Sequence, residues 1–184
     1  MVVQGSIKVM HSAVNRGDVG SIPSPGDMKG DNMPGVVYYI NLDEEVKELS
    51  NFSRHPVEVD GVLYMTSEHY FQAAKFFETE PEWAKAIAST RWPSEAFKMG
   101  KDRSHKIDPN WDTSSALYHM ERVLFEKVKQ HKVIYDKLLA TGNAYIVERA
   151  DWDDIWGDGK NRVGKNQLGR LWMKVRNELK KAGE

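Results

Sequence analysis

The sequence predicts a single α+β domain, in which a small β-sheet packs under several α-helices. Two observations predict this class. Short apolar runs typical of strands lie near residues 36–65 and again near residue 146, and most of the chain between them has the spacing of amphipathic helices. A chain of 184 residues is also long enough for one domain with a substantial hydrophobic core.

Four short strands are expected. The first is the run 36–40, and the last is the run 145–147. Between them, the runs 57–59 and 62–65 flank the pair Asp60-Gly61. An Asp-Gly pair between two such runs is typical of a two-residue hairpin.

The helices are predicted from apolar spacing and from residues that start or stop a helix. Thr79 and Glu82 are spaced as a capping box with Pro81 in the first turn, which predicts a helix through Ala88. A further helix is expected after Thr66 or Ser67, either of which can cap it. The remaining helices are expected over 93–100, around 117–128, over 134–139 before Gly142, and over 168–179.

Composition excludes several classes of function. The chain has 26 basic and 27 acidic residues, so no global charge attracts duplex nucleic acid or an anionic membrane. It has no cysteine, which excludes disulfides, thiolate zinc sites and cysteine nucleophiles. No apolar run is long enough to span a bilayer, and no signal peptide is recognisable, so a cytoplasmic protein without membrane contact is expected.

Residues 1–34 differ in composition from the rest of the chain. They hold five Gly, four Ser and three Pro and have little periodic apolar content. This composition predicts a flexible N-terminal tail. The folded domain is therefore expected over residues 35–184.

One helix face carries polar groups where a core stripe is expected. Glu68, Gln72 and Lys75 fall at positions i, i+4 and i+7, so they share one face of a helix that is rich in Tyr and Phe. Burying a carboxylate, an amide and an amine without partners is costly, which points to the wall of a pocket. The alternative is that Glu68 only complements the helix dipole while the Lys75 ammonium reaches solvent.

The second unusual region is the segment 148–166. Five acids lie from Glu148 to Asp158, with Trp152 and Trp156 among them, whereas residues 160–181 hold eight basic residues and one acid. An acidic, aromatic loop beside a basic helix start suits a ligand with a flat base, a ribose and a phosphate. The alternative is a solvated acidic loop.

Two nucleotide or metal motifs fit this segment poorly. Residues 159–166 nearly match a phosphate-binding P-loop, but Asn166 replaces the hydroxyl residue that binds magnesium. A calcium-binding EF-hand loop from Asp151 fails because its sixth residue is Trp156 rather than Gly. Asp153 or Asp154 could still hold a magnesium ion, although nothing in the pattern requires one.

Taken together, several short motifs resemble the NADAR family, also called YbiA-like proteins. They extend from about Val37 to Leu179. In chain order they are Leu49-Ser50-Asn51-Phe52, Thr66-Ser67-Glu68-His69-Tyr70-Phe71-Gln72 with Lys75-Phe76, Trp111, Met120, Leu139-Ala140-Thr141-Gly142, Glu148, Asp153-Asp154-Ile155-Trp156-Gly157-Asp158-Gly159, Gly164-Lys165-Asn166-Gln167-Leu168-Gly169, Met173 and Arg176. The common order and spacing of these motifs make the resemblance specific.

The resemblance implies an N-glycosidase that needs neither a metal nor a cofactor. Members of the family cleave a bond between a base amine and C1 of a phosphorylated ribose. One group removes ADP-ribose from guanine in nucleosides or nucleic acid, which is the preferred expectation here. Another cleaves early phosphorylated intermediates of riboflavin synthesis. A module that binds ADP-ribose or NAD without turnover is the alternative from another class.

Candidate site residues follow from this chemistry. Cleavage builds positive charge on the sugar, so Glu68 is the expected acid/base, and Asp153 is the other candidate carboxylate. Lys75, if desolvated, can attack C1 and carry the ribose as a Schiff base. The substrate-binding residues are expected to be Asn51, Phe52, Gln72, Trp111, Trp156, Gly157, Gly159, Gly164 and Asn166.

These binding residues have different expected roles. The two tryptophans, Trp111 and Trp156, stack on the base or pack in the core. The amides of Asn51 and Gln72 bind ribose hydroxyls or base edges, and the glycines let backbone N–H groups approach phosphate. The partners expected are a small molecule that contains ADP-ribose or ribose phosphate, and ADP-ribosylated DNA or RNA ends. His69 is expected to be structural, whereas His119 and His131 show no partner pattern in the sequence and are expected to fill the surface or the core.

Overall fold

The computed structural model describes residues 36–183, so the predicted tail over 1–34 lies outside the described residues. The elements are β1 (Val37–Tyr39), a 3-10 turn η3 (Lys47–Leu49), β2 (Val57–Val59), β3 (Val62–Tyr64), α1 (Ser67–Ala74), α2 (Pro81–Ala88), α3 (Pro93–Met99), α4 (Thr113–Gln130), α5 (Lys132–Ala140), β4 (Tyr145–Val147) and α6 (Gln167–Gly183). The α+β class is confirmed, with helices dominant.

The strands form two separate pairs instead of one sheet. β1 runs parallel to β4, with Val37 opposite Tyr145. β2 and β3 form the expected antiparallel hairpin. Its turn residues Asp60 and Gly61 both have positive φ, 52° and 77°, which is the backbone that a right-twisted two-residue hairpin requires.

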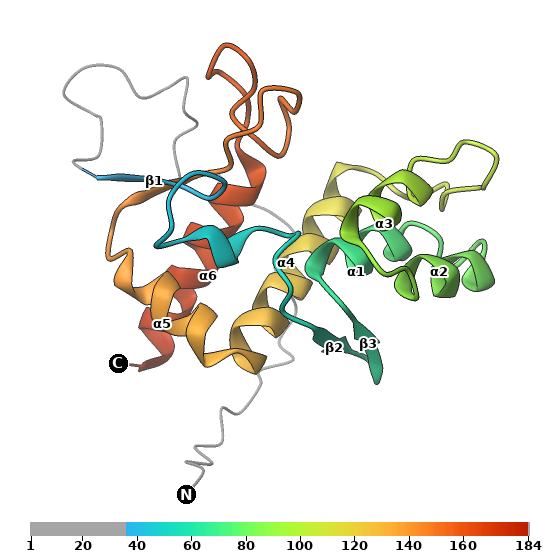
Figure 1. Ribbon diagram of the computed structural model, residues 1–184, viewed down its shortest axis with the longest axis horizontal. Coiled ribbons are helices and arrows are strands. Elements are labelled where there is room, and N and C mark those ends of the chain that lie inside the picture. Colours follow the sequence, from blue (N-terminus) through green and yellow to red (C-terminus); the bar gives the residue numbers. More distant parts are fainter. Residues whose placement is uncertain (1–35, 184) are drawn as a thin grey trace, which may run out of the picture.

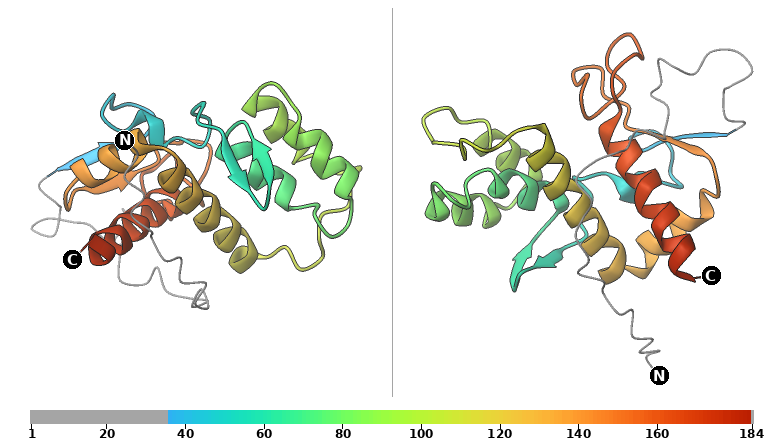
Figure 2. Two further views of the ribbon diagram at one scale, coloured as in Figure 1. Left: turned by 90° about the horizontal axis from the view of Figure 1, so that it is seen from below. Right: turned by 180° about the vertical axis from the view of Figure 1, so that it is seen from behind.

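The helices are arranged on both sides of α4 (Figure 1). α1, α2 and α3 lie together on one side, whereas α5, α6 and the β1–β4 pair lie on the other, and a second view shows the same division (Figure 2). The segment between β4 and α6 projects beyond the start of α6 (Figure 1). No helix in residues 36–183 is long and apolar enough to cross a membrane.

Helix α1 is the buried centre of the first group. All eight of its residues are buried, because α2, α3 and α4 pack around it. Thr66 caps the helix by accepting a hydrogen bond from the backbone N–H of His69. Because the neighbouring helices cover α1 on its polar face as well as on its apolar face, its polar residues are also enclosed in the domain interior.

The predicted capping box at the start of α2 is wrong. Thr79 donates instead to the carbonyl of Lys106 at 2.5 Å. The Glu80 carboxylate, which lies at the cap position of α2, accepts bonds from the Lys106 backbone N–H and the His105 ring, each at 2.5 Å. The loop after α3 folds back onto this helix start, a long-range contact that local spacing does not encode.

Candidate active site

The polar face of α1 forms a continuous hydrogen-bonded chain. The Lys75 ammonium donates to Gln72 Oε1 at 2.5 Å, and Gln72 Nε2 donates to Glu68 Oε1 at 2.7 Å. Glu68 is only 5% exposed and Gln72 only 3%. Gln72 therefore links the acid to the amine, and the acid and the amide are enclosed in the protein rather than solvated.

Burial shifts the pKa of both ionisable groups toward neutrality. It raises the pKa of the Glu68 carboxyl to about 7, although the Gln72 hydrogen bond and the Lys75 charge oppose this shift. Burial also lowers the pKa of the Lys75 ammonium to about 8, against the opposing effect of the Glu68 charge. At neutral pH the carboxyl is therefore partly protonated, and roughly one lysine in ten is a neutral amine.

The end of α3 encloses the amine. Lys75 Nζ also donates to the carbonyl of Gly100 at 3.2 Å and lies 5.5 Å from the centroid of the Phe71 ring. A Cβ atom at residue 100 would lie 1.9 Å from Gln72 Oε1, so a glycine is required for this close approach. These contacts favour the desolvated lysine over the alternative in which its ammonium reaches solvent.

The loop before β2 brings Asn51 to the acid. The Asn51 carbonyl accepts the backbone N–H of Glu68 at 3.1 Å. Its side-chain Nδ2 lies 3.3 Å from the sulfur of Met120, and its buried Oδ1 has no protein partner in the described structure. Phe52, which follows, is 43% exposed and contacts Phe97 edge-on at 6.4 Å.

Lys127 of α4 holds this loop, and the sequence analysis missed it. Its fully buried ammonium donates to the carbonyls of Glu48 and Ser50 at 2.7 and 2.9 Å and to the Ser53 hydroxyl at 2.7 Å. Burial lowers its pKa to about 7. A lysine in a charged stretch of an amphipathic helix usually faces water, so the sequence offers no signal of this role.

Both predicted tryptophans approach α1 through Phe71. The Phe71 ring lies 5.7 Å from Trp111 and 5.2 Å from Trp156, edge-on in each case. Both tryptophans are only partly buried, so each keeps some surface for a ligand. Residues more than 80 positions apart in the chain thus form one aromatic group beside Lys75.

Two histidines have different outcomes. His69 is structural as expected, because its ring nitrogens contact the Thr66 hydroxyl at 2.8 Å and the Thr90 carbonyl at 3.1 Å. His119, expected to fill the surface or the core, packs among aromatic rings and has partners that the sequence did not indicate. It stacks on Trp111 with centroids 5.3 Å apart, and its Nδ1 pairs with the Tyr70 hydroxyl at 2.9 Å.

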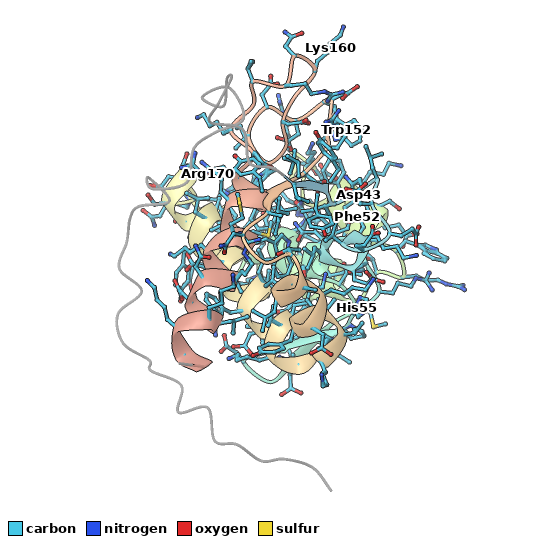
Figure 3. All side chains as sticks on the ribbon, turned by 90° about the vertical axis from the view of Figure 1, so that its left-hand side faces the viewer. Asp43, Phe52, His55, Trp152, Lys160 and Arg170 are labelled. Carbon is cyan, nitrogen blue, oxygen red and sulfur yellow. The ribbon has the colours of Figure 1, made fainter. Side chains whose placement is uncertain are left out.

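Asp153 shapes the acidic loop. Its Oδ1 accepts the backbone N–H groups of Ile155 and Trp156 at 2.9 and 2.8 Å, and this fixes the turn that carries the tryptophan. Its charge is also among the causes that raise the pKa of Glu68. Trp152 is 81% exposed on the same loop, whose outer tip carries Lys160 (Figure 3).

The loop's own backbone surrounds its glycines. A Cβ at residue 157 would lie 2.7 Å from the Ala150 side chain, and one at residue 164 would lie 2.6 Å from the Gly157 carbonyl. Gly159 has a φ of +66°. These glycines are therefore needed for the loop to fold, and their role toward phosphate stays a prediction.

Asn166 is enclosed between β4 and α6. Its Oδ1 accepts the Glu148 backbone N–H, and its Nδ2 donates to the Ile146 carbonyl, each at 2.9 Å. Both ends of the amide thus contact the backbone around β4. Its expected contact with substrate has no support from this geometry and also stays a prediction.

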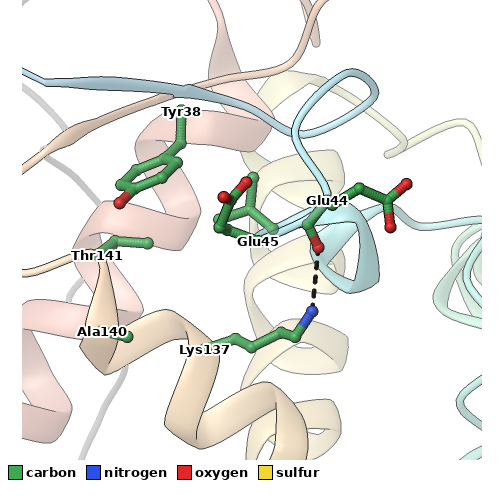
Figure 4. Close-up of a pocket in the computed structure, with 7 residues that line it drawn as sticks. Tyr38, Glu44, Glu45, Lys137, Ala140 and Thr141 are labelled. Atoms are coloured by element: carbon green, nitrogen blue, oxygen red, sulfur yellow. Dashed lines mark hydrogen bonds between the residues drawn. The ribbon is translucent and has the colours of Figure 1, made fainter.

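One hollow lies away from these residues, between β1, the turn after it and α5 (Figure 4). Its volume is about 410 Å³, and it is lined by Tyr38, Glu44, Glu45, Val46, Lys137, Ala140 and Thr141. Lys137 is already engaged there by the Glu44 carbonyl at 3.1 Å and the Glu48 carboxylate at 2.5 Å. We place the candidate site at α1, because Glu68 and Lys75 lie there in one hydrogen-bonded chain and both have pKa values near neutrality. The hollow includes no residue of this chain. In residues 36–183, no three acidic or histidine side chains cluster in a way that could hold a metal.

Comparison with known proteins identifies the family. Residues 37–180 match the NADAR domain. N-glycosidase YbiA of Escherichia coli (strain K12) is 37% identical over 144 residues, which cover 78% of this chain and 88% of that protein. The NMR structure of E. coli YbiA superposes with a TM-score of 0.72 at 34% identity, covering 88% of this chain and 95% of that one. The protein belongs to the NADAR family.

Two further relatives differ in their names. N-glycosidase Npun_R5314 of Nostoc punctiforme is 32% identical over 146 residues, covering 79% of this chain and 93% of that protein. Riboflavin biosynthesis protein VVA0006 of Vibrio vulnificus is 30% identical over 153 residues, covering 83% of this chain but only 41% of that protein. The expectation of an N-glycosidase is confirmed at the level of the family.

Proposed function

We propose that this protein is an N-glycosidase that removes ADP-ribose from ADP-ribosylated guanine, in a nucleoside or at DNA or RNA ends. The observation that carries the proposal is the enclosed chain from Lys75 through Gln72 to Glu68. It offers a proton donor and a nucleophile on one face, both with pKa values near neutrality. General acid catalysis and amine nucleophiles work best under these conditions.

In the proposed first step, the neutral amine of Lys75 attacks C1 of the ribose while the bond from C1 to the base nitrogen breaks. The electron pair of that bond leaves with the base, which takes the proton of the Glu68 carboxyl. The carboxylate that remains is positioned to stabilise the positive charge on the sugar–lysine adduct. Phe71, Trp111 and Trp156 provide the aromatic surface that grips the departing base.

In the second step, the adduct opens and is hydrolysed. A proton moves from the Lys75 nitrogen to the ring oxygen as the bond from C1 to that oxygen breaks, which leaves a protonated Schiff base. Water then adds to C1 and releases the sugar as an aldehyde. The lysine leaves as a neutral amine, and the remaining proton returns to Glu68.

The substrate is tested by product analysis. The protein is incubated with ADP-ribosylated guanosine, and free ADP-ribose and guanosine are measured by mass spectrometry. The proposal expects both products in equal amounts. Tight binding of the substrate without any product would favour a binding module instead.

The Schiff base is tested by borohydride reduction. Treating the enzyme and substrate with borohydride should leave a stable sugar adduct on Lys75, which peptide mapping identifies. The matched control is Lys75→Ala, which should yield no adduct. A fully active Lys75→Ala protein without any adduct would remove the lysine from the chemistry and leave acid catalysis by Glu68.

A second candidate substrate is an early phosphorylated intermediate of riboflavin synthesis. It is favoured by the name of the Vibrio relative, although this chain spans less than half of that protein. Both substrates present the same bond, so the same site residues apply. Comparing kcat/KM for the two substrates decides between them.

A further inference from the structure

Glu148 stands at the carboxyl end of β4, beside the residues that follow β1. The parallel pair β1–β4 ends with Tyr39 opposite Val147, and the next backbone bond joins the Ile40 N–H to the Val147 carbonyl at 2.9 Å. Glu148 and Asn41 thus leave the two strands at the same edge. In parallel sheets, ligands commonly bind at this edge, outside the carboxyl ends of the strands.

All but one of the hydrogen-bonding groups of Glu148 are occupied. Its N–H donates to Asn166 Oδ1, and its carbonyl accepts the Asp158 N–H, each at 2.9 Å. Its Oε1 accepts Asn41 Nδ2 at 2.7 Å. Of the polar groups of Glu148, only Oε2 is enclosed and has no hydrogen-bond partner within residues 36–183.

An enclosed carboxylate oxygen without a partner is costly, so this position calls for a donor that the protein itself does not supply. Burial raises the pKa of the Glu148 carboxyl to about 7, the charges of Asp153, Asp158 and Glu68 act in the same direction, and the Asn41 hydrogen bond opposes them. Glu148 therefore belongs to the same electrostatic neighbourhood as the proposed acid. Its partner Asn41 is exposed, so the pair extends to the surface.

We propose that Glu148, oriented by Asn41, binds the 2-hydroxyl of the substrate ribose and makes the site specific for ribose over 2-deoxyribose. The inference rests on the proposed function, which places C1 of a ribose beside Glu68 and Lys75. The 2-hydroxyl is the donor on the carbon next to C1. Oε2 is an acceptor held on an anchored carboxyl group, and acidic side chains at strand ends are suited to binding ribose hydroxyls.

The test compares the binding of ribose 5-phosphate and 2-deoxyribose 5-phosphate by calorimetry. At pH 8.5, where most of the Glu148 carboxyl is ionised, the wild-type protein should bind the ribose compound about 10- to 100-fold more tightly, the range for one hydrogen bond to a charged group. Glu148→Gln should reduce this ratio to about threefold or less by weakening only the binding of the ribose compound. Asp151→Asn is the matched control on the same loop, because Asp151 is exposed and pairs with Arg162, and it should keep the wild-type ratio.

A second variant tests the same role without changing Glu148, in case Glu148→Gln does not fold. Asn41→Ala keeps the Glu148 carboxyl but removes the amide that orients it, so its ratio should also fall. An unchanged ratio in either folded variant overturns the proposal. An equal loss of affinity for both sugars overturns it too, because that pattern indicates a structural role.

This experiment measures binding and requires no turnover, so it can fail independently of the proposed function. If ADP-ribosylated guanosine is hydrolysed but the wild type does not distinguish the two sugars, only the role of Glu148 falls. If the ratio depends on Glu148 but no N-glycoside is hydrolysed, the proposed reaction falls and the ribose site stands.

Discussion

Moving the pH two units away from 7.5, in either direction, is expected to slow turnover about 20-fold. The proposed first step requires a protonated Glu68 and a neutral Lys75, whose pKa values are about 7 and about 8. At pH 7.5 each group is in the required state in about a quarter of the molecules, so roughly 6% of the enzyme is active. At pH 5.5 the neutral lysine falls to about 0.3%, and at pH 9.5 the protonated carboxyl falls to the same level.

The assay is kcat/KM for release of ADP-ribose between pH 5.5 and 9.5, with circular dichroism to verify folding at each pH. The expected profile is bell-shaped, with its maximum between pH 7 and 8. Any residual activity of Glu68→Gln should lose the alkaline limb and keep the acidic one, because the acid that must stay protonated is gone while Lys75 must still lose its proton. A flat profile in the wild type, or an alkaline limb that survives in Glu68→Gln, would refute the reasoning.

Three further substitutions test parts of the site. Trp156→Ala should lower kcat/KM about 10-fold or more by removing a stacking surface worth roughly 1–3 kcal/mol. Trp152→Ala, at an 81% exposed position, should change kcat/KM less than about twofold. Equal effects would contradict the assignment of Trp156 to substrate stacking. Lys127→Met should lower the free energy of unfolding by about 2–4 kcal/mol in denaturant melts, since two buried carbonyls lose their donor. Lys132→Met, which removes an exposed ion pair, should change this free energy by less than about 0.5 kcal/mol. Similar values for the two variants would contradict the role of Lys127 in holding the loop before β2. Gly164→Ala should lower the melting temperature by several degrees, because its Cβ would lie 2.6 Å from a backbone carbonyl, and an unchanged melting temperature would count against this packing.

Local patterns in the sequence predicted much of the fold. The spacing of Glu68, Gln72 and Lys75 placed them on one helix face, and the helix geometry alone determines this relation. The hairpin at Asp60-Gly61 followed for a similar reason, since few residue pairs tolerate two positive φ values in succession.

Contacts between distant segments could not be predicted in this way. The capping box at Thr79 failed because residues 105–106 return to that helix start and supply other partners. Lys127 was missed because its three acceptors lie more than 70 residues earlier in the chain. The contact of the Asn166 amide with the backbone around β4 could not be predicted for the same reason, since nothing in the residues near Asn166 indicates it.

The role of Glu68 is the central claim, and one variant tests it most directly. Glu68→Gln nearly preserves the volume of the side chain and its contact with Gln72 but cannot donate a carboxyl proton or stabilise a cation. The measurement is single-turnover release of ADP-ribose from ADP-ribosylated guanosine, with Glu58→Gln as the control at an exposed acid. The account predicts a loss of about 10²–10⁴-fold in Glu68→Gln and wild-type rates in the control. Near wild-type release by folded Glu68→Gln would contradict it.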